Sequence, residues 1–485
     1  MRAFVFLIPP DKRKMTMKKY QRLAQQIMEQ IDRGVWQAGD RLPSLREQVR
    51  HSGMSFMTVG HAYQLLESQG RIIARPQSGY FVAPRPVERQ PAPPAQVMRD
   101  EAVDINTTIF EILQASCDAR VLPFGSAFPD PHLFPQQQLN RSLANISKTA
   151  TAMSVIENLP PGNAALRHAI ARRYAQQGMT ISPDEIVITA GALEALNLSL
   201  QAVTEPGDWV IVENPCFYGA LQALERLKLK ALSVATDVTE GIDLDALAQA
   251  LNEYPVKACW LMTNSQNPLG FTLSAAKKER LVALLAAHNV TLIEDDVYSE
   301  LYYGREKPLP AKAWDTQDMT LHCSSFSKCL VAGFRIGWVA AGKHARRIQQ
   351  LQLMSTLSTS SPMQLALVDY LSTQRYDAHL RRLRRALAER KQLAWQALLR
   401  HLPPEVKIHH SDSGYFLWIE LPAPLDAGAL CEQALAHHIS IAPGKMFSTS
   451  DAWVPFFRFN TSWGWGHREE QAVKLLGELI YNELN

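Results

Sequence analysis

The stretch that decides the fold of this 485-residue chain is SSFSKCLVAGFRIGW, residues 324–338. It places a single lysine, Lys328, in a short polar run between two apolar segments that resemble strands. An amine becomes a useful nucleophile toward an aldehyde only when its surroundings lower its pKa. The serines before Lys328 and the guanidinium of Arg335 after it suit an aldehyde that carries a phosphate. A lone lysine in serine-rich sequence is more often a solvent-exposed loop residue, so this interpretation depends on the rest of the chain.

The motif S-F-S-K followed by G-F-R-I-G-W resembles the cofactor-lysine segment of fold-type I aminotransferases. The resemblance implies that the cofactor is pyridoxal 5'-phosphate and that Lys328 bonds to its aldehyde. It also implies that Arg335 holds the cofactor phosphate, with Ser325 and Ser327 as neighbouring contacts.

Length and composition set the limits of the fold. A chain of 485 residues, 46% hydrophobic and 20% charged, predicts two or three globular domains. The six cysteines show no C-x-x-C pair and no metal-ligand spacing with histidine, which predicts neither a disulfide framework nor a metal site and favours the cytoplasm. No apolar run approaches the ~18 residues that a membrane span needs. We expect residues 1–16 to be a disordered extension.

Residues 17–83 predict a small basic domain. They hold nine Lys and Arg residues against five Asp and Glu residues, which favours a polyanionic partner. Apolar residues at helical spacing predict a first helix that ends at Gly34, and Ser44 with Glu47 forms an S-x-x-E capping box that begins a second. A third helix begins at Ser55, and a β-hairpin follows. Three helices also suit a plain packing module, so periodicity alone leaves DNA binding open.

The motifs G-D-R-L-P-S-L-R-E and S-G-Y-F-V resemble the GntR-type winged helix over essentially this whole domain. The resemblance implies double-stranded DNA as a partner, with the third helix in the major groove and the hairpin tip in the minor groove. Phe56 stands where the family usually has arginine, which removes a cationic contact and leaves a thymine methyl or nothing as its target. We expect DNA contacts from Arg41, Ser44, Arg46, Ser55, Thr58, His61 and Gly79.

Residues 84–103 are proline-rich without apolar periodicity and predict an extended linker. From residue 104 to residue 485, helical patterns alternate with short β-branched strands. This alternation predicts an α/β domain with a mainly parallel sheet. The aminotransferase resemblance adds a smaller C-terminal subdomain.

The other cofactor candidates follow predicted strands. Gly191, Ala192 and Leu193 begin a helix whose free amides suit a phosphate, although one glycine at such a turn is more often plain turn chemistry. The resemblance places the phosphate there. It also implies that an aromatic residue stacks on the cofactor ring, and we choose Phe217 over its neighbour Tyr218.

Three further roles come from the same resemblance. Asn267 hydrogen-bonds the cofactor's phenolic oxygen, Asp295 keeps the ring nitrogen protonated, and Tyr298 tunes the bonded amine. Arg458, flanked by apolar residues on a predicted strand, is costly to bury without an anion, so it binds a substrate carboxylate or makes an internal salt bridge.

A GntR-type winged helix joined by a Pro-rich linker to an aminotransferase-like domain is the arrangement of MocR-type regulators, which this chain resembles. The resemblance implies a pyridoxal-phosphate-dependent transcriptional regulator that senses an amino acid, an amine or the cofactor itself, and that forms a homodimer. A working aminotransferase with an accessory DNA-binding domain is the alternative. A third interpretation, a DNA-binding protein with a dead cofactor fold, is weakened because Lys328, Asp295 and Arg458 are all present.

Overall fold

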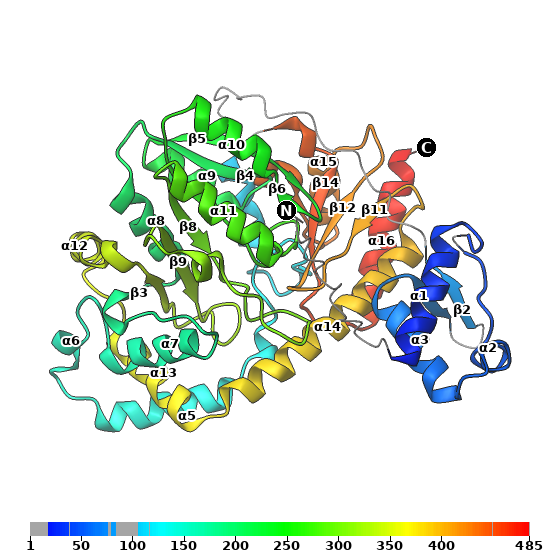
Figure 1. Ribbon diagram of the computed structural model, residues 1–485, viewed down its shortest axis with the longest axis horizontal. Coiled ribbons are helices and arrows are strands. Elements are labelled where there is room, and N and C mark those ends of the chain that lie inside the picture. The colour runs from blue at the N-terminus through cyan, green and yellow to red at the C-terminus, as the bar shows by residue number, and fades with distance from the viewer. Residues whose placement is uncertain are drawn as a thin grey trace, which may run out of the picture. The chain divides into compact units, whose positions relative to one another are not determined.

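The computed structural model describes residues 18–37, 39–75, 79–83, 105–115, 117–448 and 450–484 (Figure 1). The predicted disordered extension, the predicted linker and the hairpin turn at residues 76–78 lie outside the described residues. The chain divides into two compact units, Met1–Glu88 and Arg89–Asn485.

Over its described residues, the first unit contains three helices and a two-stranded antiparallel hairpin. The Ser44 backbone N–H donates to Glu47 Oε2 at 2.7 Å and the Glu47 backbone N–H donates to Ser44 Oγ at 3.3 Å, so the predicted capping box is present. Gly53, with φ of +65°, ends the second helix. The elements are α1 (Lys19–Asp32), α2 (Leu45–Ser52), α3 (Phe56–Ser68), β1 (Ile72–Arg75) and β2 (Gly79–Val82).

One apolar core holds these elements together. Buried side chains of α1 and α3 pack against each other and against the hairpin at the spacing that the sequence predicts. The Tyr63 hydroxyl donates to the Pro43 carbonyl at 2.8 Å and so satisfies its only polar group inside this core. The principal core residues are Leu23, Ile27, Ile31, Val59, Ala62, Tyr63, Leu66 and Ile72.

The second unit is built on an eight-stranded sheet, counted over the described residues. Strands β3, β9, β8, β7, β4 and β5 run in one direction, whereas β10 and β6 run against their neighbours. The sheet is thus mainly parallel, as predicted. In spatial order the strands are β3 (Ile186–Thr189), β10 (Gly337–Ala340), β9 (Thr320–Ser325), β8 (Thr291–Asp295), β7 (Val256–Leu261), β4 (Trp209–Asn214), β5 (Lys230–Asp237) and β6 (Gly241–Ile242).

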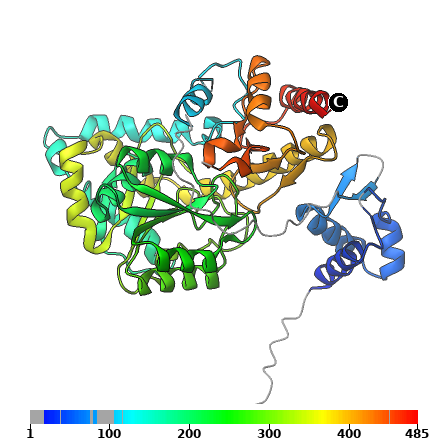
Figure 2. The same ribbon diagram turned by 90° about the horizontal axis from the view of Figure 1, so that it is seen from above.

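Helices cover both faces of this sheet (Figure 2). Successive residues of β4 show why: Val210 and Val212 pack into one apolar cluster and Ile211 packs into another. A strand buried on both faces reads as a continuous apolar run, which is how β4 reads in the sequence. The helices of this part are α4 (Ile105–Ala115), α5 (Gln136–Thr149), α6 (Ser154–Glu157), α7 (Ala164–Ala175), α8 (Ala192–Val203), α9 (Tyr218–Arg226), α10 (Leu244–Glu253), α11 (Ala275–Ala287), α12 (Ala345–Ser355) and α13 (Ser361–Thr373).

The predicted smaller C-terminal subdomain is a four-stranded antiparallel sheet with helices beside it. Its strands, in spatial order, are β11 (Lys407–His409), β12 (Phe416–Glu420), β14 (Phe456–Asn460) and β13 (Ala442–Pro443), and its helices are α14 (Tyr376–His401), α15 (Ala427–Ala436) and α16 (His467–Leu484).

Helix α8 is exposed at its first turn and buried further along. Helical spacing puts Leu193, Leu196 and Leu200 on one face of α8, and Leu193 is 47% exposed while the other two are buried. Leu193 lies in the first turn of α8, where the helix begins at the edge of the sheet, and helical spacing does not reveal where a helix leaves the core.

Among the described residues, no helix is both long enough and apolar enough to cross a membrane, and no three His, Cys, Asp or Glu side chains lie where they could hold a metal ion.

Candidate cofactor site and DNA-contacting surface

The predicted cofactor residues meet at the carboxyl ends of the parallel strands. Strand β8 ends at Asp295, and β9 ends three residues before Lys328. Strand β3 ends two residues before Gly191. Open α/β sheets bind their ligands at this edge because the loops that follow the strands converge there.

The amine of Lys328 lies in an enclosed, partly aromatic position. It donates to the carbonyl of Ala127 at 2.9 Å and lies 4.6 Å from the ring centroid of Phe128 and 5.8 Å from that of Tyr298. Burial and the nearby guanidinium of Arg458 lower the pKa of Lys328 to about 7, against the attraction of a buried carboxylate. A large fraction of this amine is therefore neutral, and hence nucleophilic, at neutral pH.

That carboxylate belongs to Asp295. Burial raises its pKa to about 7, although Lys328 and a backbone N–H from Val297 favour the ionised form. One of its oxygens, Oδ1, is buried and has no hydrogen-bond partner among the described residues. A buried acceptor without a partner is costly, so Oδ1 suits a donor supplied by a ligand.

The N-terminus of α8 and Arg335 form a second cluster. Gly191, with φ of +85°, caps α8 without a side-chain hydrogen bond, so its first amides remain available. A Cβ at this glycine would lie 2.3 Å from Arg335 Nη2, which shows how closely the guanidinium approaches the helix. Arg335 itself has φ of +53°, a strained conformation for a non-glycine residue, and its Nη1 donates to Ser327 Oγ at 3.3 Å. A helix N-terminus beside a guanidinium is well suited to a phosphate.

The side chain of Arg458, on β14, is fully buried. Its two terminal nitrogens donate to Asn267 Oδ1 and to the Gly125 carbonyl, each at 2.7 Å, and its Nε has no hydrogen-bond partner in the part of the chain that the structure describes. Among the described residues no carboxylate forms an ion pair with it, so the internal salt bridge that the sequence left open is not found there. The rings of Phe416 and Phe447 lie 4.4 and 5.0 Å from its guanidinium carbon. A buried cation with a free donor favours an anionic ligand.

Phe217 and Tyr218 lie side by side, with their ring centroids 4.7 Å apart. Phe217 is half-buried just before α9, while the Tyr218 phenol interacts electrostatically with Arg458. Phe217 stays our prediction for the ring-stacking residue, with Tyr218 as its rival.

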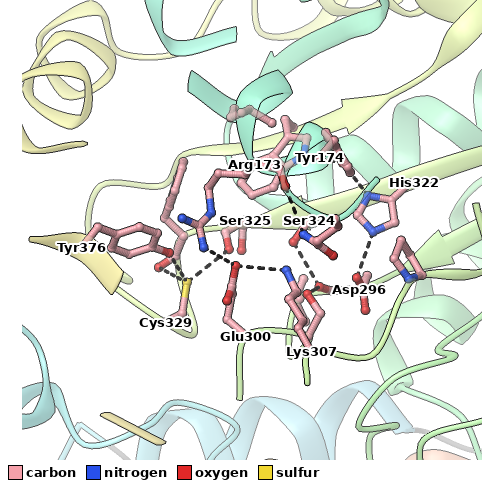
Figure 3. Close-up of a pocket in the computed structure, with 17 residues that line it drawn as sticks. Arg173, Tyr174, Asp296, Glu300, Lys307, His322, Ser324, Ser325, Cys329 and Tyr376 are labelled. Atoms are coloured by element: carbon pink, nitrogen blue, oxygen red, sulfur yellow. Dashed lines mark hydrogen bonds and ion pairs between the residues drawn. The ribbon is translucent and has the colours of Figure 1, made fainter. Parts of the chain in front are cut away.

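A cavity of about 40 Å³ borders the lysine segment and is lined in part by Ser325 and Cys329 (Figure 3). Burial opposes the ionisation of Glu300 there, but Lys307 at 3.0 Å and Arg173 at 2.9 Å outweigh it and lower its pKa to about 2. These ion pairs line the same cavity as Ser325 and Cys329 of the lysine segment.

The same cavity contains a chain of buried hydrogen bonds. Trp338 Nε1 donates to the Tyr174 hydroxyl at 2.9 Å, and that hydroxyl lies 2.6 Å from His322 Nδ1. Because a carboxylate only accepts, His322 Nε2 donates to Asp296 at 2.9 Å, and in the neutral imidazole Nδ1 then accepts the tyrosine proton. Asp296 also accepts from Asn264 at 2.9 Å. The chain holds the backbone beside Asp295 in place.

The predicted DNA-contacting residues lie on one small unit. Arg41 and Arg46 are exposed, and the guanidinium of Arg41 lies against Gly79 at the start of β2, where an added Cβ would be 3.4 Å from its Nε. Ser44 caps α2. Ser55 caps α3, and its hydroxyl lies 2.9 Å from that of Thr58.

His61 is exposed on α3 and packs edge-on against the ring of Tyr20, with centroids 5.9 Å apart. The wing strand, the exposed cations and α3 therefore belong to one compact unit.

Comparison with known proteins accounts for both units. Residues 19–82 match the family described as bacterial regulatory proteins, gntR family, and residues 134–464 match aminotransferase class I and II. The HTH-type transcriptional regulator YdcR of Escherichia coli K12 is 81% identical over 468 residues, which cover 96% of this chain and 100% of that protein. This chain belongs to the GntR-type transcriptional regulators that carry a class I and II aminotransferase domain.

Two further proteins are similar to this chain, one over nearly its whole length and one over most of it. The HTH-type regulator YjiR of Escherichia coli K12 is 33% identical over 96% of this chain and 100% of its own length. The crystal structure of LysN, an α-aminoadipate aminotransferase from Thermus thermophilus complexed with N-(5'-phosphopyridoxyl)-L-leucine, is 28% identical with a TM-score of 0.71, covering 78% of this chain and 95% of LysN.

The site of this GntR-type regulator has the features that pyridoxal phosphate needs. An unpartnered acid oxygen of Asp295 suits a ring N–H, and the start of α8 with Arg335 suits a phosphate. A lysine with a pKa of about 7 suits an aldehyde. These three features belong to this chain's own residues, so the suitability of the site for the cofactor does not rest on the family comparison.

Several side chains of this regulator's site are absent from the sequence-based prediction. Phe128 lies against the Lys328 amine, the Tyr415 hydroxyl donates to the Ala127 carbonyl at 2.9 Å, and Phe416 packs on Arg458. These side chains lie in the segments F-P-D, residues 128–130, and S-G-Y-F, residues 413–416, where no residue type by itself indicates a role. Only contacts between distant segments reveal it.

Proposed function

We propose that the larger unit binds pyridoxal phosphate at Lys328 and an amino acid through its carboxylate at Arg458, and that this binding changes the affinity of the winged-helix unit for DNA. The observation that carries the proposal is Arg458, a buried guanidinium with a free Nε donor and no anionic partner among the described residues. A protein keeps such a charge in its interior when a ligand neutralises it.

Each predicted residue has a role in this proposal. Asp295 accepts from the ring nitrogen and Lys328 supplies the amine that bonds to the aldehyde. Asn267 hydrogen-bonds the phenolic oxygen, Tyr298 tunes the bonded amine, and Phe217 stacks on the ring. The phosphate contacts are the backbone of Gly191, Ala192 and Leu193 together with the side chains of Ser325, Ser327 and Arg335.

The bound cofactor would supply an aldehyde and an electron-withdrawing ring to an amine ligand. The chain's own contribution is to hold and orient that ligand. Arg458 fixes the carboxylate, and the aromatic side chains of Phe416 and Phe447 beside it exclude water, which strengthens the ion pair. An amine that lacks a carboxylate forgoes this contact, so we expect amino acids to bind more tightly than simple amines.

Ligand binding would change the affinity for DNA through thermodynamic linkage. If the amino acid binds one state of the larger unit better than another, and the two states differ in DNA affinity, each ligand changes the affinity for the other by the same factor. A coupling of about 1–3 kcal/mol corresponds to a change from about fivefold to about a hundredfold.

A second candidate function is amino-group transfer itself. Lys328, Asp295 and Tyr298 lie together at the sheet edge, and the lysine pKa of about 7 is the value that proton transfer at neutral pH requires. The same pKa also serves cofactor attachment, so amino-group transfer stands as the alternative on the presence of all three side chains.

We further propose that the protein is a homodimer that acts in the cytoplasm. Four large apolar side chains stand exposed at the start of α8 and the end of α12, and the Thr356 hydroxyl donates to Glu194 across these two ends. Monomeric proteins rarely leave such a patch uncovered, and a second copy is a suitable cover. The exposed residues are Leu193, Leu353, Met354 and Leu357. The proposed domain limits remain 17–83 and 104–485.

One titration tests the two functions against each other. Amino acids that alter the visible spectrum of the cofactor-loaded protein are titrated against labelled DNA from upstream of its gene, while keto-acid formation is measured in parallel. Altered DNA affinity with slow or absent turnover supports the regulator. Rapid turnover with constant DNA affinity would refute it and favour the aminotransferase.

A further inference from the structure

The solvent-facing side of α3 carries no cation. Residues Phe56, Met57, Gly60, His61 and Gln64 follow the helical spacing of one face, opposite the buried residues of the same helix. Phe56 is 55% exposed and Met57 is 69% exposed. The helix therefore begins with two adjacent, uncovered apolar side chains, followed by a glycine and two polar side chains.

Gly60 leaves this face of α3 open to close approach. A Cβ at this position would meet no atom of the described residues within 4 Å, so the packing of the unit does not require a glycine. Glycine in a helix interior destabilises it relative to alanine. A helix that accepts this cost without an internal reason favours an external one, which is the clearance for a partner.

The cations of the unit lie on other elements. Arg46 is exposed on α2, and Arg41 lies against the start of β2, so both stand beside α3 rather than on it. Arginines flanking an uncharged helix suit a duplex, because its phosphates border the major groove and its base edges form the floor. The apolar group that the major groove presents on a base edge is the C5 methyl of thymine.

We propose that Phe56 and Met57 recognise thymine methyl groups in the major groove, so that each half-site carries thymines facing the start of α3. This inference rests on the proposed DNA binding and adds to it the basis of sequence preference. Arg41 and Arg46 then supply affinity through phosphates, and the apolar pair supplies discrimination. His61 and Gln64, one turn further along, face the next bases with polar groups.

The test uses the full-length protein and duplexes selected by it from a random-sequence pool. Each thymine of a selected duplex is replaced in turn by deoxyuridine, which removes only the methyl. We expect about a fourfold loss of affinity for each methyl that becomes buried, at one or two positions per half-site. Placing 5-methylcytosine rather than cytosine at those positions should recover part of the loss.

Two variants and a control locate the effect. Phe56→Ala and Met57→Ala should bind the thymine and deoxyuridine duplexes equally, because the partner of the methyl is gone. Val35→Ala is the matched control, since Val35 is an apolar side chain of the same unit, 63% exposed and outside α3, and it should leave the methyl preference unchanged. Gly60→Ala should raise the melting temperature while weakening DNA binding, two effects that a merely structural role would not combine.

The failure of this inference differs from the failure of DNA binding. If selected duplexes bind, and Arg46→Ala weakens them, but no thymine methyl affects affinity, the inference is overturned and the DNA-binding proposal stands. If Phe56→Ala instead disrupts self-association with no change in methyl preference, the pair belongs to a protein interface and the inference is equally overturned. If no duplex in the pool binds, both proposals fail.

Discussion

The guanidinium of Arg458 donates to the side-chain oxygen of Asn267, 191 residues earlier in the chain, at 2.7 Å. This contact joins the four-stranded C-terminal sheet to the turn after strand β7 of the central sheet. The residue proposed to hold the ligand carboxylate thus touches the residue proposed to hold the cofactor. Occupation of one position changes the hydrogen bonds available at the other, which is the physical basis for expecting the two ligands to act together.

Replacing Lys328 by alanine should abolish covalent attachment of pyridoxal phosphate and leave the protein folded, because the amine makes a single hydrogen bond and does not belong to the apolar core. Mass spectrometry after borohydride reduction measures the attachment, and circular dichroism checks the fold. Lys343→Ala, which removes an exposed lysine, is the control. A Lys328→Ala protein that still carries the reduced cofactor would show that another lysine bonds to it.

The rate at which cofactor-free protein captures pyridoxal phosphate should rise with pH and level off above about pH 8. The neutral amine is the nucleophile, and the pKa of Lys328 is about 7, so its neutral fraction grows through that value. The negative charge of Asp295 raises the lysine pKa, so Asp295→Asn should move the midpoint to lower pH. Stopped-flow absorbance measures the rate, and a midpoint near pH 10 would contradict the prediction.

Arg458→Met should weaken amino-acid binding and spare cofactor attachment. Hydrogen bonds to a charged group contribute about 1.5–3 kcal/mol, so the affinity for the amino acid should fall by a factor between about ten and more than a hundred. Spectral titration of the cofactor-loaded protein gives the affinity. The control is an amine of the same side chain without a carboxylate, which should bind the variant and the wild type alike; equal losses for both ligands would point to a general disturbance of the site.

Glu300→Gln should destabilise the protein at neutral pH. Its pKa is lowered to about 2 in the folded state from an ordinary 4.5, so its ionisation stabilises the fold above about pH 4.5, and this contribution is lost as pH falls toward 2. The shift corresponds to about 3 kcal/mol. Urea unfolding at pH 7 and at pH 3 measures the difference, which should shrink at the lower pH, and Glu306→Gln, at an exposed site, should change neither value. A deficit independent of pH would assign the effect to packing.

Arg46→Ala should weaken DNA binding. If the side chain contacts a base edge, the cost is about 1–3 kcal/mol at particular sequences, and if it contacts phosphate, the loss is uniform and the salt slope falls by about one. Fluorescence anisotropy at several salt concentrations distinguishes these outcomes. Arg33→Ala, which removes an exposed arginine at the end of α1, is the control. Equal losses of affinity in the two variants would show that Arg46 contributes only through the net charge of the unit.

The winged-helix elements and the alternation of helices and strands follow from the sequence alone, because they depend on short-range physics. Ser44 and Glu47 are three residues apart, so the capping box can be recognised within four consecutive residues of the sequence. The apolar spacing of α1 and α3 is equally local. The lysine motif is also local, which is why Lys328 and Arg335 could be named from one stretch of 15 residues, 324–338.

The tertiary structure alone decided which charges are satisfied. Whether Arg458 has an anionic partner, and whether Asp295 keeps an unpartnered oxygen, depends on segments hundreds of residues apart that meet at one sheet edge. The same holds for the exposure of Leu193, which shares a helical face with the buried Leu196 and Leu200 but lies in the first turn of α8. Burial and desolvation are properties of the assembled packing, and no local pattern of residues encodes them.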